Sequence, residues 1–324
     1  MDTKSGPLKV PSLDRDRGGE TGAAIWKIDR FAIHDGPGIR TNLYFKGCPL
    51  RCFWCSNPEG QENKPELAYS QVRCTACGRC YDVCPTGALK PEAGQAGLDF
   101  LECTNCGQCV SVCLPGALSL YQRSYTLEQV MEVVKRDRHA YRRSGGGITC
   151  TGGEPFLQAG FLMDLLTACR KQGIHTAVES SGCVNPSQFR DALDRIDWLF
   201  LDLKHLDPER HRHLTGRDNA VILQNLRTAS SVFGNSGKVL VIRLVVAPGL
   251  NDGDNITALA EMARSLPRVD FVELLPYHAY GREKYQSLGR TYRLDGLETP
   301  DEETMSRYRE IIEEHGVKCR IGQT

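Results

Sequence analysis

Residues 41–55 read TNLYFKGCPLRCFWC, a β-branched and aromatic segment followed at once by a loop with three cysteines. The first seven of these residues are predicted to form a strand. Cys48, Cys52 and Cys55 follow with three and then two intervening residues and no fourth cysteine nearby. Three thiolates on a 4Fe–4S cluster would leave one iron without a protein ligand, and an open metal position is typical of catalytic sites. The alternative is that a cysteine elsewhere supplies the fourth ligand.

After this loop, short apolar runs alternate with amphipathic segments. The runs predict buried strands and the segments predict helices. Strands are expected at 23–28, 41–47, 147–152, 174–180, 197–204, 238–246, 270–276 and 317–321, and helices at 126–143, 161–172, 186–196, 220–233, 255–266 and 301–315. Counting from strand 41–47 gives six βα units. The pattern predicts an α/β fold with a parallel sheet, and favours a partial (β/α)6 barrel over an open doubly wound sheet.

Unusual polar residues lie at the carboxyl ends of these predicted strands. In such folds the strand ends meet at one edge and carry the chemistry. Besides the three cysteines, this edge would hold Gly152, Gly153, Glu154, Glu179, Ser180, Asp202, Lys204, Arg243, Val245 and His278. The sequence therefore predicts one site at that edge.

Eight further cysteines form two runs with the spacing C-x2-C-x2-C-x3-C. The runs begin CTACGRC and CTNCGQC, repeat with a 29-residue period, and match at 10 of 16 positions. This is the bacterial ferredoxin spacing, in which the fourth cysteine of each run ligates the other cluster. Two 4Fe–4S clusters are therefore expected, one on Cys74, Cys77, Cys80 and Cys113 and the other on Cys103, Cys106, Cys109 and Cys84. Zinc and disulfides are weaker alternatives, because zinc usually takes two separated ligand pairs and disulfide scaffolds belong to small secreted chains.

Composition excludes several classes of protein. The 324-residue chain has 40 Lys plus Arg and 40 Asp plus Glu, so no net field attracts nucleic acid or an anionic membrane. No apolar run approaches the ~18 residues of a membrane span, and the polar N-terminus is not a secretory signal. We expect a reducing, cytoplasmic location.

The expected organisation is a disordered tail at 1–21, a barrel from 22–72 and 121–324, and a ferredoxin-like insert at 73–120.

The loop GCPLRCFWC resembles the CxxxCxxC motif of radical S-adenosylmethionine (SAM) enzymes. More narrowly, the chain is similar to glycyl radical enzyme activating enzymes, the family of the pyruvate formate-lyase activase. The similar segments, in the family's order, are DGPGIRTNLYFKGCPLRCFWCSNPE, SGGGITCTGGEP, DLK, IRLVVAPGLND, LPYHAYGREKY and LDGLETPDEETM, within residues 25–322. Because the pyruvate formate-lyase activase lacks the insert, the chain is more similar to insert-bearing activases of eliminating, decarboxylating or fumarate-adding enzymes.

The resemblance implies reductive cleavage of SAM to a 5′-deoxyadenosyl radical, which takes a hydrogen atom from a backbone glycine of a partner enzyme. The implied partners are that enzyme's C-terminal glycine loop and a flavodoxin or ferredoxin electron donor, with the free protein a monomer. The insert would relay electrons, or would be structural or a docking element. Two other functions stay open: a radical SAM enzyme acting on a small molecule, and a non-catalytic electron carrier.

The resemblance also implies residue roles. Those implied to contact SAM or a monovalent cation are Trp54, Cys55, Ser56, Gly152, Gly153, Glu154, Glu179, Ser180, Asp202, Lys204, Arg243, Val245 and His278. Lys204 suits the SAM carboxylate, and Asp202 with Glu179 would hold the cation. Asp35 lies where the family orients the incoming glycine loop. The alternative for Asp202 and Lys204 is a buried ion pair with no ligand.

Overall fold

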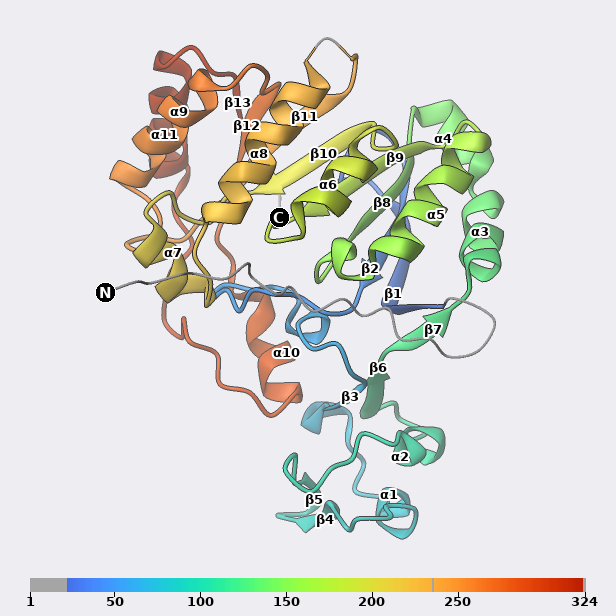
Figure 1. The fold of residues 1–324 in the computed structure, drawn as a ribbon. Coiled ribbons are helices and arrows are strands. Elements are labelled where there is room, and N and C mark those ends of the chain that lie inside the picture. The colour runs from blue at the N-terminus through green and yellow to red at the C-terminus, as the bar shows by residue number, and fades with distance from the viewer. Residues whose placement is uncertain (1–21, 235, 323–324) are drawn as a thin grey trace, which may run out of the picture.

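A nine-stranded sheet forms the centre of the molecule (Figure 1). The computed structural model describes residues 22–234 and 236–322, so the tail predicted at 1–21 lies outside the described residues. In spatial order the strands are β13 (Cys319–Ile321), β12 (Phe271–Pro276), β11 (Val239–Val246), β10 (Trp198–Asp202), β9 (His175–Ser180), β8 (Gly147–Gly152), β2 (Arg40–Phe45), β1 (Ala23–Ala32) and β7 (Arg123–Tyr125).

Seven strands of this sheet pair in parallel, namely β2, β8, β9, β10, β11, β12 and β13. At one edge, β1 pairs antiparallel with both β2 and β7. The parallel strands follow one another in chain order, so their order never reverses. A doubly wound sheet needs such a reversal. The predicted α/β fold with a mostly parallel sheet is therefore confirmed, and the described part of the chain is not doubly wound.

Helices between the parallel strands bury their apolar faces against the sheet. They are α5 (Ala159–Lys171), α6 (Pro186–Leu193), α8 (Ala220–Phe233), α9 (Asp254–Ser265) and α11 (Glu302–Glu314). Leu162 of α5 and Leu226 of α8 are fully buried, as are Leu199 and Leu240 of the strands. Burial of this kind explains why the strands are near-continuous apolar runs.

The single helix predicted at 126–143 is wrong in one respect, because the structure breaks it at Asp137. The first part, α3 (Leu127–Arg136), begins at a capping box made by Thr126, and α4 (Arg138–Ser144) follows. The Asp137 carboxylate accepts hydrogen bonds from Arg30 Nε at 2.8 Å and Thr41 Oγ1 at 2.9 Å. These contacts with β1 and β2 hold the break in place.

Two short helices, α7 (Pro208–Thr215) and α10 (Arg282–Ser287), had no counterpart in the sequence prediction. The α7 sequence PERHRHLT is mostly charged and shows no apolar period. It is defined instead by capping, since the Asp207 carboxylate accepts from the Arg210 amide at 2.7 Å, and by a buried His211.

Residues 66–121 form a small unit at the bottom of Figure 1 with its own apolar cluster. Two antiparallel strand pairs frame it, β3 (Glu66–Tyr69) with β6 (Leu118–Tyr121) and β4 (Leu89–Glu92) with β5 (Gln95–Leu98). Two short helices, α1 (Arg79–Asp82) and α2 (Gln108–Val112), each begin after a glycine in the left-handed conformation. Among the described residues, no helix combines the length and apolar character that a membrane crossing requires.

Candidate functional site

The carboxyl ends of the parallel strands lie at one edge of the sheet, because their register keeps them level. Phe45 of β2 is paired with Gly152 of β8, and Asp202 of β10 with Arg243 of β11. Val246 of β11 is likewise paired with Pro276 of β12. The structure therefore brings the residues expected at this edge together.

The loop with Cys48, Cys52 and Cys55 follows β2 and is held by its backbone. The Cys48 amide donates to the Gln61 carbonyl at 2.9 Å, and the Arg51 amide donates to the Thr215 carbonyl of α7 at 2.7 Å. Burial raises the pKa of all three thiols, that of Cys52 to about 12. Since metals bind the thiolate and deprotonate coordinating thiols, three buried thiols on one loop fit a bound iron–sulfur cluster.

Gly152 and Gly153 lie directly against this loop. Gly152 has a φ of 103°. The Gly153 amide donates to the Phe45 carbonyl at 2.8 Å. A Cβ atom added to Gly153 would lie 2.1 Å from the carbonyl oxygen of Gly47 and 2.5 Å from that of Gly60. Only glycine permits this approach, so the Gly-Gly turn and the cysteine loop are packed as one piece.

Glu154 follows this turn and connects it to the next strand. Its side chain is fully buried. One carboxylate oxygen accepts from Ser180 Oγ at 2.9 Å, and the other accepts from the Ser181 amide at 2.9 Å and from Ser181 Oγ at 2.6 Å. Burial raises the pKa of Glu154 while these bonds lower it. The carboxylate thus ties the end of β8 to the end of β9.

A buried ion network lies just inside the edge. Arg243 Nη1 donates to Glu179 at 2.7 Å, and its Nε donates to Glu273 at 2.6 Å. The second oxygen of Glu179 accepts from Thr151 Oγ1 at 2.5 Å. The guanidinium also lies 4.0 Å from the centre of the Phe200 ring, a favourable cation–π distance.

This network does not fit the expected monovalent cation. Both oxygens of Glu179 already have partners, the Ser180 hydroxyl donates to Glu154, and Asp202 is paired with Lys204. The Arg243 guanidinium already supplies positive charge between the acidic groups. We therefore assign no cation to these residues.

Glu179 should make the stability of the protein depend on pH. Burial raises its pKa from about 4.5 to about 7, although Arg243 lowers it. The folded state then holds this proton more tightly than the unfolded state. The free energy of unfolding should fall as the pH rises from about 4.5 to about 7, by up to about 1.4 kcal/mol per pH unit.

Denaturant unfolding under anaerobic conditions at several pH values would check this, with Glu179→Gln expected to flatten the dependence. Glu209, a largely exposed glutamate paired with Arg212, provides the control, because Glu209→Gln should leave the slope unchanged. An unchanged slope in Glu179→Gln would show that another group titrates.

Lys204 and Asp202 form the ion pair that the sequence left open, with Nζ 2.9 Å from the carboxylate. Lys204 is 8% exposed, and the charge of Lys204 lowers the pKa of Cys52. The lysine therefore lies close enough to the cysteine loop to influence it electrostatically, and it keeps two further N–H donors for an anionic group.

The remaining expected residues are placed around the same loop or inside the sheet. Trp54 is buried and its indole N–H has no hydrogen-bond partner. Ser56 is exposed, and its carbonyl accepts from Lys284 Nζ at 2.9 Å. His278 stacks on Tyr280 with ring centres 4.8 Å apart.

Two further positions were expected to take part. The Val245 carbonyl already accepts from Asn251 Nδ2 at 2.7 Å. Asp35 precedes β2 in the chain, its carboxylate accepts from the Asn42 side chain, and its charge raises the pKa of Glu179.

Sequence reasoning missed Glu273 and Thr151, which complete the ion network. A charge inside the apolar strand FVELLP is the signal that could have identified Glu273, as it did for Arg243. It also missed the pair of Lys46 and Glu66, 2.9 Å apart and largely buried, which joins the sheet to the small unit.

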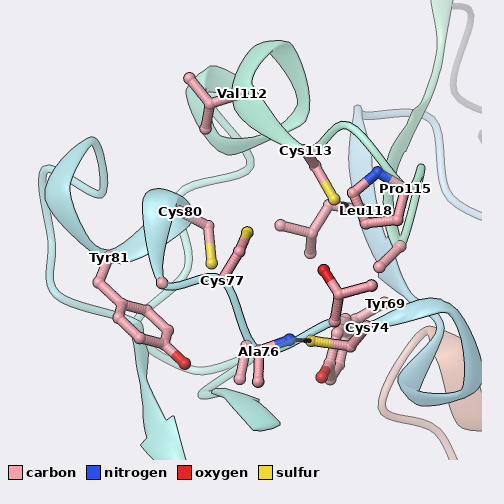
Figure 2. A pocket seen from close by; sticks show the side chains of 14 residues that line it. Tyr69, Cys74, Ala76, Cys77, Cys80, Tyr81, Val112, Cys113, Pro115 and Leu118 are labelled. Atoms are coloured by element: carbon pink, nitrogen blue, oxygen red, sulfur yellow. Dashed lines mark hydrogen bonds between the residues drawn. The ribbon is translucent and has the colours of Figure 1, made fainter.

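Two cavities in the small unit are each lined by four cysteines. The first cavity is lined by Cys74, Cys77, Cys80 and Cys113 (Figure 2). The second cavity is lined by Cys84, Cys103, Cys106 and Cys109. These are the two crossed sets that the ferredoxin spacing predicts.

Backbone amides lie against cysteine sulfurs in both cavities. The amides of Asn105 and Leu118 each donate to a cysteine sulfur at 3.4 Å. No group of three or more His, Cys, Asp or Glu side chains among the described residues converges tightly enough for one metal ion. All fifteen cysteines are free thiols in this structure.

Comparisons with known proteins agree with this site. The family model described as Radical SAM superfamily matches residues 42–262. The indoleacetate decarboxylase activating enzyme of Tractidigestivibacter scatoligenes is 37% identical, over 95% of this chain and 99% of its own. The isethionate sulfite-lyase activating enzyme of Oleidesulfovibrio alaskensis is 40% identical, over 90% and 95%. The 4-hydroxyphenylacetate decarboxylase activating enzyme of Clostridioides difficile is 35% identical, over 92% and 95%.

An α/β sheet with a three-cysteine loop after its first parallel strand, matched by this family model, defines the class as radical SAM enzymes. Within that superfamily, the chain belongs to the glycyl radical enzyme activating enzymes. The enzyme class and the function predicted from the sequence motifs are thereby confirmed.

Proposed function

We propose that SAM is bound at the three-cysteine loop and that this protein uses it to activate one partner glycyl radical enzyme. The observation that carries the proposal is the packing of Gly153 and Glu154 against that loop, where the Glu154 amide donates to the Gly47 carbonyl at 2.6 Å. When bound, the cluster supplies one electron that cleaves a carbon–sulfur bond of SAM, yielding methionine and the radical that takes a hydrogen atom from glycine.

The chain's own residues bind and orient SAM. Lys204, while paired with Asp202, offers its two remaining N–H donors to the SAM carboxylate, and backbone groups of Gly152 and Gly153 face the amine. The buried, unpartnered indole N–H of Trp54 offers a donor beside the nucleoside. Holding these groups on packed strand ends keeps SAM and the glycine loop in register.

The small unit is proposed to hold two further 4Fe–4S clusters in its two cavities, giving three in all. Its role is to relay electrons from a flavodoxin or ferredoxin to the three-cysteine loop. Two observations support the presence of these clusters: the same cysteine spacing occurs in both runs, and each cavity is lined by three cysteines of one run and one of the other. A structural or docking role is the alternative.

The partner's glycine loop is proposed to meet Asp35, whose carboxylate is fixed by Asn42. The sheet around it would form a partial (β/α)6 barrel that excludes water and oxygen. We further propose a monomer when free and a cytoplasmic location, where low-potential clusters stay reduced.

Electron paramagnetic resonance on the partner tests the proposed function. The anaerobically reconstituted protein, SAM, a strong reductant and a candidate partner should give the doublet of a glycyl radical and one methionine per radical. A partner in which that glycine is changed to alanine is the control. Turnover of SAM without any radical on a partner would favour a small-molecule radical SAM enzyme. Absence of 5′-deoxyadenosine despite about twelve irons per chain would favour an electron carrier.

A further inference from the structure

The two cavities of the small unit differ in their surroundings, although the repeat makes them equivalent in sequence. We propose that electrons arrive at the first cavity from an acidic one-electron carrier protein, which docks on a basic rim there, and leave through the second cavity. This inference rests on the proposed function, since it assumes a cluster in each cavity and one at the three-cysteine loop.

The second cavity lies nearer the three-cysteine loop. Its wall includes Leu67, which follows Glu66, and Glu66 is anchored 2.9 Å from Lys46, two residues before Cys48. The first cavity is lined instead by Tyr69, two residues further along β3. Because a strand advances about 3.3 Å per residue, this wall lies roughly 7 Å further from the anchor.

A second contact holds the segment before Cys103 against the main part of the protein. Phe100, three residues before Cys103, packs its ring on Gly289, where an added Cβ atom would lie 2.3 Å from the ring. Gly289 follows α10, and Tyr285 of that helix accepts from Gln61 Nε2 at 3.2 Å. The Gln61 carbonyl in turn accepts from the Cys48 amide. Packed side chains therefore connect the second cavity to the three-cysteine loop.

Charge distinguishes the two rims. Arg73 and Arg79 precede cysteines of the first run, and the equivalent positions of the second run, 29 residues later, are Glu102 and Gln108. Both arginines are exposed and form no ion pair among the described residues. Asp82, at the end of α1, is the acidic residue of the first run, so residues 73–84 carry two positive charges and one negative charge. A partner that docks there must present negative charge.

Exposed apolar side chains lie beside the first cavity in sequence, as Leu101, 97% exposed, does beside the second. Val72 is 97% and Leu114 is 75% exposed, and they lie next to the first cavity in sequence, before Cys74 and after Cys113. In Figure 2 the sulfurs of Cys77, Cys80 and Cys113 point into the cavity between α1 and α2. Exposed apolar residues beside unpaired arginines and a cysteine-lined cavity fit the small, charge-steered contacts of transient electron-transfer complexes.

The electron count is simple. The carrier, a low-potential flavin or iron–sulfur protein, is oxidised by one electron, and the first cavity's cluster is reduced by one. No bond forms or breaks at this docking step, and no proton moves. The same single electron passes through the second cavity to the three-cysteine loop.

The test is a charge reversal, Arg73→Glu with Arg79→Glu, in the fully reconstituted protein. Binding of oxidised flavodoxin, an acidic protein, should weaken at least about tenfold at low salt, and reduction by flavodoxin hydroquinone in stopped flow should slow by a similar factor. Both differences should shrink at high salt. The matched control is Arg190→Glu with Arg227→Glu, the same charge change at exposed positions of α6 and α8, which should bind normally.

Equal weakening in both double variants would overturn the proposal, as would faster reduction of Glu102→Arg with no effect at Arg73 and Arg79. If the charge-reversed variant loses iron, the salt dependence of flavodoxin binding to the unaltered protein still tests the proposal. Binding that does not depend on salt would contradict a basic docking rim. Photoreduction by a small deazaflavin bypasses docking. Absence of 5′-deoxyadenosine from the unaltered protein under deazaflavin would overturn the proposed function itself, separately from the docking surface.

Discussion

Replacing Cys48, Cys52 and Cys55 together by alanine should reduce the formation of 5′-deoxyadenosine to background. It should also remove about four of about twelve irons per chain. The loop would keep its fold, because backbone bonds to Gln61 and Thr215 hold it. The measurement is anaerobic incubation with SAM and photoreduced deazaflavin, followed by quantification of 5′-deoxyadenosine and iron.

The matched control removes one cysteine from each cavity, Cys77→Ala with Cys106→Ala. This variant should also lose iron, yet it should form 5′-deoxyadenosine normally with deazaflavin and lose that activity with flavodoxin. Persistence of 5′-deoxyadenosine in the triple variant would refute a SAM site at this loop. An unchanged rate of 5′-deoxyadenosine formation by the double variant with flavodoxin would contradict the electron relay.

Gly153→Ala should have the second largest effect. Its methyl group would meet the carbonyl oxygens of Gly47 and Gly60 at 2.1 and 2.5 Å, and these backbone atoms cannot rotate away. Overpacking of this kind costs about 1–3 kcal/mol, and a 1 Å shift at a reacting centre can cost about 10²-fold in rate. We expect 5′-deoxyadenosine formation to fall by about two orders of magnitude, measured with deazaflavin at saturating SAM.

Gly173→Ala separates this clash from general glycine strain. Gly173 follows α5 with a φ of 64° and has no atom within 4 Å of an added Cβ. The substitution should therefore cost about 1 kcal/mol in stability and leave the rate unchanged. Equal losses of rate in both variants would mean that the close approach of Gly153 is not what positions SAM.

Most of the sheet could be predicted from the sequence. Buried parallel strands are continuous apolar runs, and TNLYF, VLVIRLVV and FVELLP are of this kind, so their ranges differ from the structure by only a residue or two. The helix break at Asp137 and the helix α7 could not be predicted in this way. Both depend on polar contacts, Asp137 with Arg30 and Asp207 with the Arg210 amide, which leave no apolar period.

The spacing of the cysteines predicted which of them lie together, and the structure places the two predicted sets around two separate cavities. The partners of the charged residues at the strand ends could be identified only from the folded structure. Arg243 meets Glu179 across 64 residues, and Gly153 lies against Gly47 across the edge of the sheet. Such contacts follow from strand register and side-chain packing, which join segments that have no local relation in the sequence. For the same reason, only the tertiary structure shows which of two equivalent cysteine runs lies toward the sheet.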